Sequence, residues 1–310
     1  MARRAGVSQS TVSLVLSGKG VGRISARTEA VVRQAAADLG YRPNVAARAL
    51  RTGTARTVGL VVTDVTHPFF GPVLRGAQQA AWRAGYAVAL VDVANDPDRE
   101  RASFEALRAG PADGFMFFTV DPPEGSGEHV VAIEVQPPGM ASVRVDTDRG
   151  TELAVRHLLD LGHTRIGHLG SWLDAETFRR RIDAMAALLG DDVPYETAPF
   201  DYREACTATL RLLEAHPTAI FCDDDILAGG VYLAARERGL RIPEDLSVVG
   251  FDDLPFARVF EPPLTTVAID PEALGAGAFE VLLDLIGGRP AESRVLPVEL
   301  VVRESTAPPR

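Results

Sequence analysis

Short apolar runs rich in β-branched residues alternate with helical stretches from residue 57 onward. The first series is TVGLVV (57–62), AVALVDV (87–93), GFMFF (114–118) and VVAIEV (130–135), and the second is RIGHLG (165–170), TAIFC (218–222) and LSVVGF (246–251). Apolar runs separated by helices are typical of parallel sheets built from βαβ units. The pattern therefore predicts an α/β fold in which two similar lobes each contain a parallel sheet.

Between these runs, apolar residues recur at helical spacing. Helices are expected near 71–84, 150–161, 178–189, 203–215, 226–238 and 271–286, with a last strand near 295–302. We assign 57–145 and 271–291 to core lobe one, and 146–270 and 292–310 to core lobe two. Ligands of open parallel sheets bind beyond the carboxyl ends of the strands, so we expect a site in the cleft between the lobes.

The first 56 residues follow a different pattern. Two short amphipathic helices are predicted, one over 8–16 with Val12 and Val15 on its apolar side, and one over 26–39. Val31, Ala35 and Leu39 share the apolar face of the second helix, with Val32 and Ala36 beside them. Ser8 and Ser25 are candidate N-caps, and Gly40 suits a left-handed helix end. Residues 1–43 therefore predict a helix-turn-helix headpiece, followed by a hinge at 44–56 whose short helix is unstable alone.

Charge is distributed unevenly along the chain. Residues 1–56 contain ten Lys and Arg against two acidic residues, which gives +8, while the remainder carries 22 basic and 40 acidic residues, which gives −18. A basic segment attached to an acidic body indicates a tethered module that binds a polyanion.

The remaining composition narrows the class of protein. The length of 310 residues and the hydrophobic content of 46% suit about two domains with sizeable cores. No apolar run is long enough to span a membrane, and no secretory leader is visible. The only cysteines, Cys206 and Cys222, suggest a reducing compartment and are expected to pack in the core. We therefore expect a cytoplasmic protein with no membrane partner.

Several segments resemble the lactose/galactose repressor (LacI/GalR) family in order and spacing over essentially the whole chain. They include AGVSQSTVSLVLSG, YRPNVAARAL, TVGLVV, HPFF, HLLDLGHTRIGHLG, PTAIFCDDDILAGG and IPEDLSVVGFDDLPFARVFEPPLTTV. The resemblance implies a DNA-binding headpiece, a hinge helix and a core folded like the type I periplasmic sugar-binding proteins. It also implies a homodimer, or a tetramer of dimers, that represses transcription at operator DNA.

The resemblance assigns DNA contacts to the helix that begins at Ser8 and to the hinge. The base readers are Gln9, Ser10 and Leu14, where many relatives carry Arg in place of Leu14. Gln can bond bidentately to adenine, whereas Leu offers only apolar contact, for example with a thymine methyl group. The remaining contacts, to the DNA backbone or within the hinge, fall at Ser13, Arg42, Asn44, Ala47 and Leu50. Relatives also carry more of the first helix before Met1, so we expect the natural start to lie upstream, with Ala2 and Ala5 otherwise supporting the recognition helix alone.

Candidate effector contacts lie at strand ends and in loops that face the predicted cleft. They are Asp64, Phe69, Phe70, Arg181, Tyr202, Asp224 and Asp252, with Trp172 as an additional aromatic residue. Carboxylates and a guanidinium suit bidentate bonding to vicinal hydroxyls, and aromatic rings cover the apolar faces of sugars. The mixture favours a carbohydrate or polyol over a purine, although Arg181 leaves acidic ligands open.

Other polar residues in these regions have structural interpretations. Asp225 can cap the helix that follows it, and His67 and His163 suit loops and turns. No convergent His or Glu pattern accompanies the aspartates at 223–225, so no metal or cofactor is expected. The segment 119–143 is rich in Pro and Gly where relatives have a full helix, which indicates that this helix is shortened or missing.

Two other classes of protein share part of this pattern. A solute-binding protein would share the lobes but would have no use for the basic first 56 residues. An enzyme is disfavoured because the sequence lacks a G-x-S-x-G motif, a Gly-rich phosphate loop and metal-ligand spacing. We expect a repressor whose effector shifts the population of two lobe arrangements, with release of DNA as the favoured direction.

The hinge assignment makes a testable prediction. An apolar side chain inserted into the minor groove kinks the duplex and gains further contacts. Leu50→Ala should therefore weaken operator binding in a gel-shift titration while calorimetry shows unchanged effector binding. Equal operator affinity of the two proteins would contradict the assignment.

Overall fold

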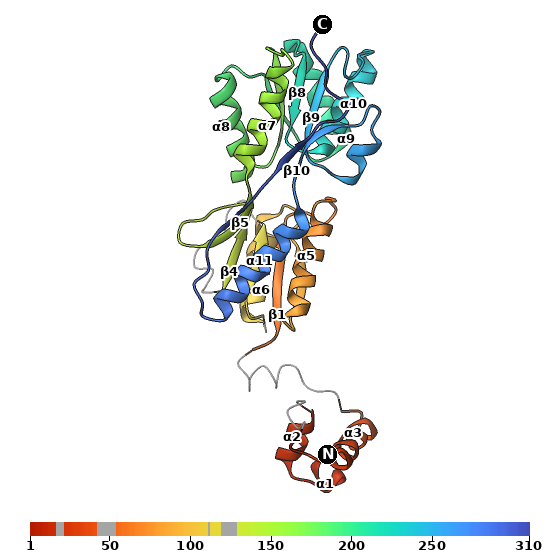
Figure 1. Cartoon of the computed structure of the whole chain (residues 1–310), viewed down its shortest axis with the longest axis vertical. Helices are drawn as coiled ribbons and strands as arrows, with labels where there is room; N and C mark the ends of the chain where they lie inside the picture. The colour runs from red at the N-terminus through yellow and green to blue at the C-terminus, as the bar shows by residue number, and fades with distance from the viewer. Residues whose placement is uncertain (17–21, 42–53, 111, 119–128) are drawn as a thin grey trace. The chain divides into compact units, whose positions relative to one another are not determined.

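The computed structural model describes residues 1–16, 22–41, 54–110, 112–118 and 129–310, and these form two compact units. The first unit covers Met1–Ala55 and the second covers Arg56–Arg310 (Figure 1). The hinge positions Arg42, Asn44, Ala47 and Leu50 lie outside the described residues, as does most of the Pro- and Gly-rich segment, at 119–128.

The described residues of the first unit form three helices around a small apolar core. They are α1 (Ala2–Ala5), α2 (Gln9–Leu16) and α3 (Ala26–Asp38). Gly6 has a φ of 63° and forms the turn between α1 and α2, a conformation that glycine adopts without strain. The side chains of Ser8 and Ser25 each accept a hydrogen bond from the backbone N–H three residues later, which confirms both predicted caps.

The buried side of α3 differs from the predicted one. Val32 and Ala35 pack against Val12 and Val15 of α2, together with Ala5. Val31 and Leu39 are instead 43% and 47% exposed within this unit. The predicted face was one residue out of phase, because α3 contains apolar residues on nearly all sides and its periodicity is weak.

The second unit consists of two lobes with a six-stranded sheet in each. The first sheet has the order β11-β5-β4-β3-β1-β2, and all its neighbouring strands are parallel. Its strands are β1 (Thr57–Val62), β2 (Ala87–Asp92), β3 (Phe115–Phe118), β4 (Val130–Ile133), β5 (Ala141–Val145) and β11 (Arg294–Leu296). One face packs on α5 (Phe70–Arg83) and α11 (Pro271–Ile286), and the other on α6 (Pro97–Ala109).

The second lobe repeats this plan with one antiparallel edge. Its sheet has the order β12-β10-β9-β8-β6-β7, and only β12 runs antiparallel to its neighbour. The strands are β6 (Ile166–Ser171), β7 (Tyr195–Ala198), β8 (Ala219–Cys222), β9 (Ser247–Asp252), β10 (Thr265–Ala268) and β12 (Glu299–Val301). The helices are α7 (Thr147–Asp160), α8 (Glu176–Leu189), α9 (Tyr202–Leu212) and α10 (Asp225–Arg238), with short 3-10 turns at Leu213–Ala215 and Pro255–Val259. These findings confirm the predicted two-lobed α/β core.

Three connections join the lobes. The chain crosses after β5, after β10 and between β11 and β12 (Figure 1). The predicted last strand near 295–302 is therefore two strands, and Arg294–Leu296 belongs to the first sheet rather than to lobe two, in which we had placed everything from residue 292. The buried cysteines Cys206 and Cys222 lie within lobe two and are both free.

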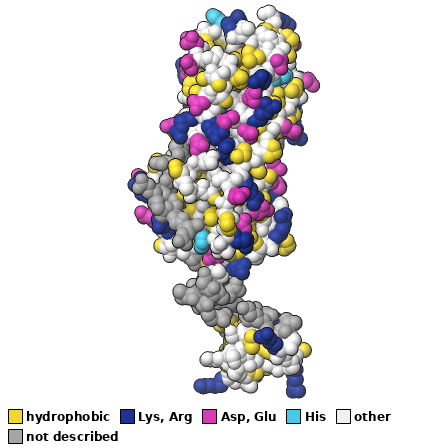
Figure 2. Space-filling view, turned by 60° about the vertical axis from the view of Figure 1, so that its left-hand side comes forward, with side chains coloured by type: hydrophobic (Ala, Val, Ile, Leu, Met, Phe, Trp, Pro, Cys, Tyr) yellow, Lys and Arg dark blue, Asp and Glu magenta, His cyan; other side chains and the backbone are white. Residues whose placement is uncertain are grey.

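Basic and acidic side chains are interspersed on the surface of the second unit that Figure 2 shows. Many belong to ion pairs on helix surfaces, such as Arg149 and Arg156 with Glu152 on α7. Exposed pairs of this kind contribute little stability each.

The contact between α5 and α11 depends on two glycines. A Cβ atom at Gly76 would lie 1.9 Å from the carbonyl oxygen of Glu272, and one at Gly275 would lie 2.0 Å from that of Val73. The two helices therefore approach closely enough for each backbone to touch the other.

Gly76→Ala should lower the free energy of unfolding of the core by about 3 kcal/mol, because a backbone carbonyl cannot move aside as a flexible side chain would. Gly71→Ala on the same helix is the control, since its Cβ would meet no atom within 4 Å. This control should leave stability unchanged or raise it by up to about 1 kcal/mol. Equal denaturation midpoints for the two variants would contradict the close contact.

Candidate functional site

A cavity lies between the two lobes of the second unit, at the carboxyl ends of their strands. It contains about 840 Å³ of space outside the atoms, including its open mouth. Lobe one contributes residues that follow β1, β2 and β4, and lobe two contributes residues that follow β6, β8 and β9. The lining combines six phenylalanines (Phe69, Phe70, Phe118, Phe178, Phe200 and Phe251) with five carboxyl groups (Asp64, Glu134, Asp223, Asp224 and Asp252).

A buried charge network forms the lobe-two wall of this cavity. His168 Nε2 donates to Asp223 Oδ1 at 2.9 Å, and the backbone N–H of Ser171 donates to Asp223 Oδ2 at 2.9 Å. Arg181 Nη1 lies 3.7 Å from Asp223 Oδ1 and donates to the Asp223 carbonyl. Burial alone would raise the pKa of Asp223, but His168, Arg181 and the Ser171 N–H together hold it below its ordinary value. Asp223 is therefore ionised and fixed in place.

Arg181 is positioned from α8 with its guanidinium between two aromatic rings. The guanidinium carbon lies 3.7 Å from the centre of the Phe251 ring and 5.2 Å from that of Phe178. The side chain is only 5% exposed, yet its Nε has no hydrogen-bond partner. A buried donor without a partner is costly, so this atom is suited to an acceptor on a bound ligand.

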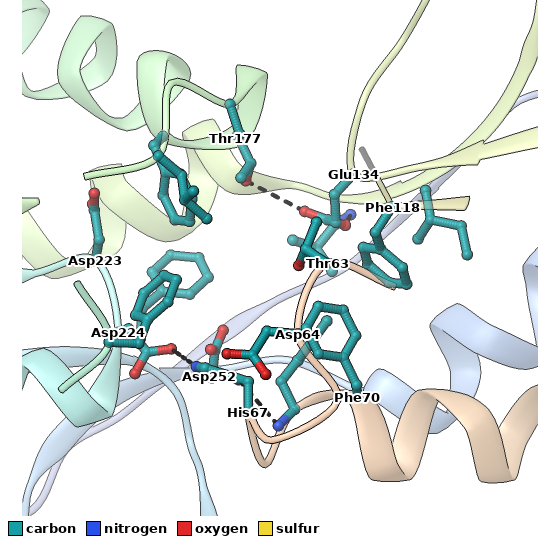
Figure 3. A pocket seen from close by; sticks show the side chains of 18 of the residues that line it. Thr63, Asp64, His67, Phe70, Phe118, Glu134, Thr177, Asp223, Asp224 and Asp252 are labelled. Carbon is teal, nitrogen blue, oxygen red and sulfur yellow. Dashed lines mark hydrogen bonds and ion pairs between the residues drawn. The ribbon is translucent and has the colours of Figure 1, made fainter. Parts of the chain in front are cut away.

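Three carboxyl groups meet at another corner of the cavity. Figure 3 shows Asp64 of lobe one close to Asp224 and Asp252 of lobe two, with His67 beside them. His67 Nε2 lies 3.0 Å from Asp224 Oδ2, but the angle does not make a regular hydrogen bond. His67, which we had expected to be a structural loop residue, thus lines the cavity and connects the lobes.

Backbone geometry at this corner is unusual. Asp252 has a φ of 106°, a conformation that costs free energy for a residue with a side chain. Burial raises the pKa of its carboxyl group well above the ordinary value, and the neighbouring Asp224 raises it further. Asp252 therefore holds its proton more tightly than a carboxyl group in water does.

Asp224, and not the predicted Asp225, caps the helix that follows. Asp224 is the N-cap of α10, since its Oδ1 accepts from the N–H of Ile226 at 2.5 Å. Asp225, the predicted cap, is fully buried and accepts from the N–H of Leu254 and from Thr266 Oγ1. It holds β9 and β10 against α10, and it does not line the cavity.

Glu134 is a cavity residue that the sequence did not reveal. It follows β4 with a φ of 63°, and its Oε1 accepts from the N–H of Val145 at 2.8 Å. Its Oε2 accepts from Thr177 Oγ1 at 3.3 Å, a hydrogen bond from lobe two to lobe one that is dashed in Figure 3. Burial raises the pKa of Glu134 to about 7, although Val145, Arg181 and Thr177 act in the opposite direction.

The structure brings together most of the predicted effector residues. Asp64, Phe69, Phe70, Arg181, Asp224 and Asp252 all line the cavity. Tyr202 does not: it is 40% exposed at the start of α9, and its ring lies over Gly229. Phe200, two residues earlier, takes the place that we had given to Tyr202. Trp172 is 51% exposed and also lies outside the lining.

The predicted DNA-reading residues occupy the start of α2. Ser8, Gln9 and Ser10 are exposed, whereas Ser13 and Leu14 are half-buried within the first unit. Val12 and Val15 point into the core of this unit. The helix therefore presents polar side chains at its N-terminal end, the part that contacts base edges in helix-turn-helix proteins.

His163, expected at a turn, is buried at the opposite end of lobe two. It hydrogen-bonds with Thr218 Oγ1 and the Ala307 carbonyl. Among the described residues, no group of His, Cys, Asp and Glu is arranged to hold a metal ion, and no helix is long and apolar enough to cross a membrane.

A helix-turn-helix unit joined to a two-lobed core with an internal cavity defines a DNA-binding regulator with a ligand-binding domain. Two family matches agree with this class: the lacI family of bacterial regulatory proteins over residues 1–44, and the periplasmic binding protein-like domain over 155–306. The chain belongs to the lacI family and is a DNA-binding transcriptional repressor of that family.

Individual relatives span nearly the whole chain. The HTH-type transcriptional repressor PurR of Mannheimia succiniciproducens is 32% identical, over 98% of this chain and 97% of its own. The structure of the lac repressor dimer bound to operator and the anti-inducer ONPF is similar with a TM-score of 0.89 and 27% identity, covering 99% of this chain and 97% of that one. The complex of the transcriptional regulator CelR with cellobiose has a TM-score of 0.73 and 27% identity, covering 98% of each chain.

The pKa of Glu134 makes a prediction about stability. The folded state holds the Glu134 proton more tightly than the unfolded chain, so the free energy of unfolding falls as pH rises from about 4.5 to about 7. Glu134→Gln mimics the protonated acid and should be more stable than the parent at pH 8 by roughly 3 kcal/mol, with little difference at pH 4.5.

Urea denaturation of the core at both pH values measures this effect. Glu105→Gln, an exposed substitution on α6, is the control and should follow the parent at both pH values. If Glu134→Gln kept the pH dependence of the parent, the burial of this carboxyl group would not be its cause.

Proposed function

We propose that this repressor binds operator DNA through the exposed start of α2 and that a small polyhydroxylated molecule, of the carbohydrate class, controls this binding from the cavity between the lobes. The observation that carries the proposal is the composition of the cavity. Aromatic rings offer apolar surface, and carboxyl groups, an amide and a guanidinium offer hydrogen bonds from both lobes. The cellobiose complex of a structural relative supports the same class of ligand.

Two interlobe contacts suggest how a ligand acts. His67 meets Asp224 across the cavity, and Glu134 meets Thr177. One lobe arrangement keeps these two pairs in contact, and another would separate them. A ligand bound between the paired groups changes the difference in free energy between the two arrangements. It can shift the two populations only by its difference in affinity for them. We propose release of operator as the direction of the response.

DNA recognition is proposed to follow the helix-turn-helix pattern. Gln9 and Ser10 contact base edges, and Leu14 offers apolar contact, while Ser8, Ser13, Arg42 and Asn44 contact the backbone. Ala47 and Leu50 act in the hinge. A homodimer, the form in which the lac repressor relative is described, would place two such helices on two half-sites one helical turn apart or a multiple of it.

The decisive experiment selects fragments of a bacterial genome by binding to the purified full chain, with and without single sugars. Enrichment of a two-fold symmetric sequence that one sugar abolishes would support operator binding, the class of ligand and the direction of the response together. Retention of no specific fragment under any condition would refute the proposal.

Arg181 provides a direct test of the cavity. Arg181→Lys keeps the positive charge beside Asp223 but loses the planar donors, including the unpartnered Nε. It should bind the selected sugar at least tenfold more weakly by calorimetry, the loss of about one charge-assisted hydrogen bond, and should keep its operator affinity without ligand.

Arg180→Lys is the matched control for this test. Arg180 is the neighbouring residue on α8, pairs with Asp148 and does not line the cavity. This variant should match the parent in both measurements. Equal ligand affinity for the two variants would exclude Arg181 from the binding site.

A further inference from the structure

We propose that the ligand of this cavity carries a protonated amine, as an amino sugar does, and that the amine is held where Asp64, Asp224 and Asp252 meet. This inference rests on the proposed function, since it specifies the class of ligand for the same cavity. A neutral sugar and an acidic ligand are the alternatives.

The first argument is the balance of charged groups in the cavity. Five carboxyl groups line it, whereas Arg181 and His67 are the only basic residues among the described residues of its lining. Arg181 pairs with Asp223, which also accepts a hydrogen bond from His168, and its positive charge also favours the ionised form of Asp252. The described lining therefore has more carboxyl groups than basic groups, and His67 is the basic residue at the corner itself.

The second argument is the set of acceptor atoms that remain at the corner. Asp64 Oδ1 accepts from the N–H and the hydroxyl of Thr66, and Asp224 Oδ1 caps α10. The second oxygen of Asp224 lies 3.0 Å from His67 Nε2, and Asp64 and Asp252 line the cavity beside this pair (Figure 3). An ammonium group has three donors and no acceptor, which matches three carboxyl groups from three different strand ends.

The third argument is the strained backbone of Asp252 beside Asp224. Asp252 has a φ of 106° and lines the cavity next to Asp224, although two carboxylates side by side repel each other. Burial and this repulsion both raise the pKa of Asp252. A cation placed between the two carboxyl groups removes the repulsion.

Further cavity groups define the rest of the ligand. The buried Nε of Arg181 requires an acceptor, which a sugar hydroxyl or ring oxygen supplies. The phenylalanine rings can cover carbon–hydrogen faces, and those nearest the corner, Phe69, Phe70 and Phe200, surround His67 at 4.9–6.4 Å between ring centres. A rigid ring that bears an amine at one position and hydroxyl groups at others satisfies both requirements. An acidic ligand would instead add a negative charge to an acidic cavity.

The test compares sugars that differ only at one substituent. Calorimetry on the full chain at pH 7 would use D-glucosamine, D-glucose and N-acetyl-D-glucosamine, and the corresponding galactose and mannose sets. In at least one set the amine should bind at least tenfold more tightly than both neutral members. While the amine stays protonated, its affinity should also rise with pH, because the pKa of Asp252 is raised and a cation competes with that proton, whereas the neutral sugars should show no such rise.

A substitution at Asp252 tests whether the corner formed by Asp64, Asp224 and Asp252 causes the preference for the amine. Asp252→Asn removes one carboxyl group, and Asn tolerates positive φ better than most residues. It should reduce the preference for the amine to threefold or less while changing neutral-sugar binding much less. Asp98→Asn, the same change of charge on the exposed surface of α6, should keep the full preference. Thermal unfolding should show that both variants are folded.

The outcomes separate this inference from the proposed function. If a neutral sugar releases the operator and no amine binds more tightly than its neutral partners, the amine inference fails and the proposed function stands. Absence of binding by every amino sugar also refutes the inference. If no operator is retained at all, the proposed function fails, whatever the sugars do. Equal preference in Asp252→Asn and the parent would refute the assigned corner.

Discussion

The ionised carboxylate of Asp223 is the constraint on which the cavity depends. A buried charge is tolerated only when partners compensate its loss of water, and Asp223 has three: the His168 ring of β6, the backbone N–H of Ser171 at the end of β6, and Arg181 of α8. These partners fix two strand ends and one helix relative to one another. Because Arg181 is held by the same group, its guanidinium is already oriented when a ligand arrives, and little conformational entropy is lost on binding.

Two residues with strained backbone line the same cavity. Glu134 follows β4 and Asp252 is the last residue of β9; both have a positive φ, and each places a carboxyl group with a raised pKa in the cavity. Both residues therefore carry a conformational cost on the wall of the cavity. The close helix contact at Gly76 and Gly275 in lobe one has no such strain, and an exposed ion pair of Arg75 with Glu272 joins the same two helices.

The hydrophobic pattern predicted the lobes because most parallel strands are buried on both faces and appear as continuous apolar runs. It missed α6, whose segment PDRERASFEALRA is mostly polar and buries only Phe104 completely, and it missed β7, an edge strand with exposed residues. Most strand-end site residues were predictable because acidic residues follow apolar runs directly. Glu134 has that signal too, after VVAI, but nothing in a single sequence distinguishes it from a surface residue. The error at Tyr202 arose because only folding shows that Phe200 turns inward while Tyr202 packs over a glycine.

Charge separation along the chain limits which part of the protein can hold DNA. Affinity for DNA arises largely from phosphates neutralised by Lys and Arg, and residues 1–56 carry +8 while the rest carries −18. The net charge of the core therefore opposes binding, and on the proposed function the operator is held by the first segment and the hinge. On the proposed function, a ligand needs to change only the competence of that segment. A coupling free energy of about 1–3 kcal/mol, within the usual range for allosteric proteins, is then enough to change occupancy of the operator several-fold or more.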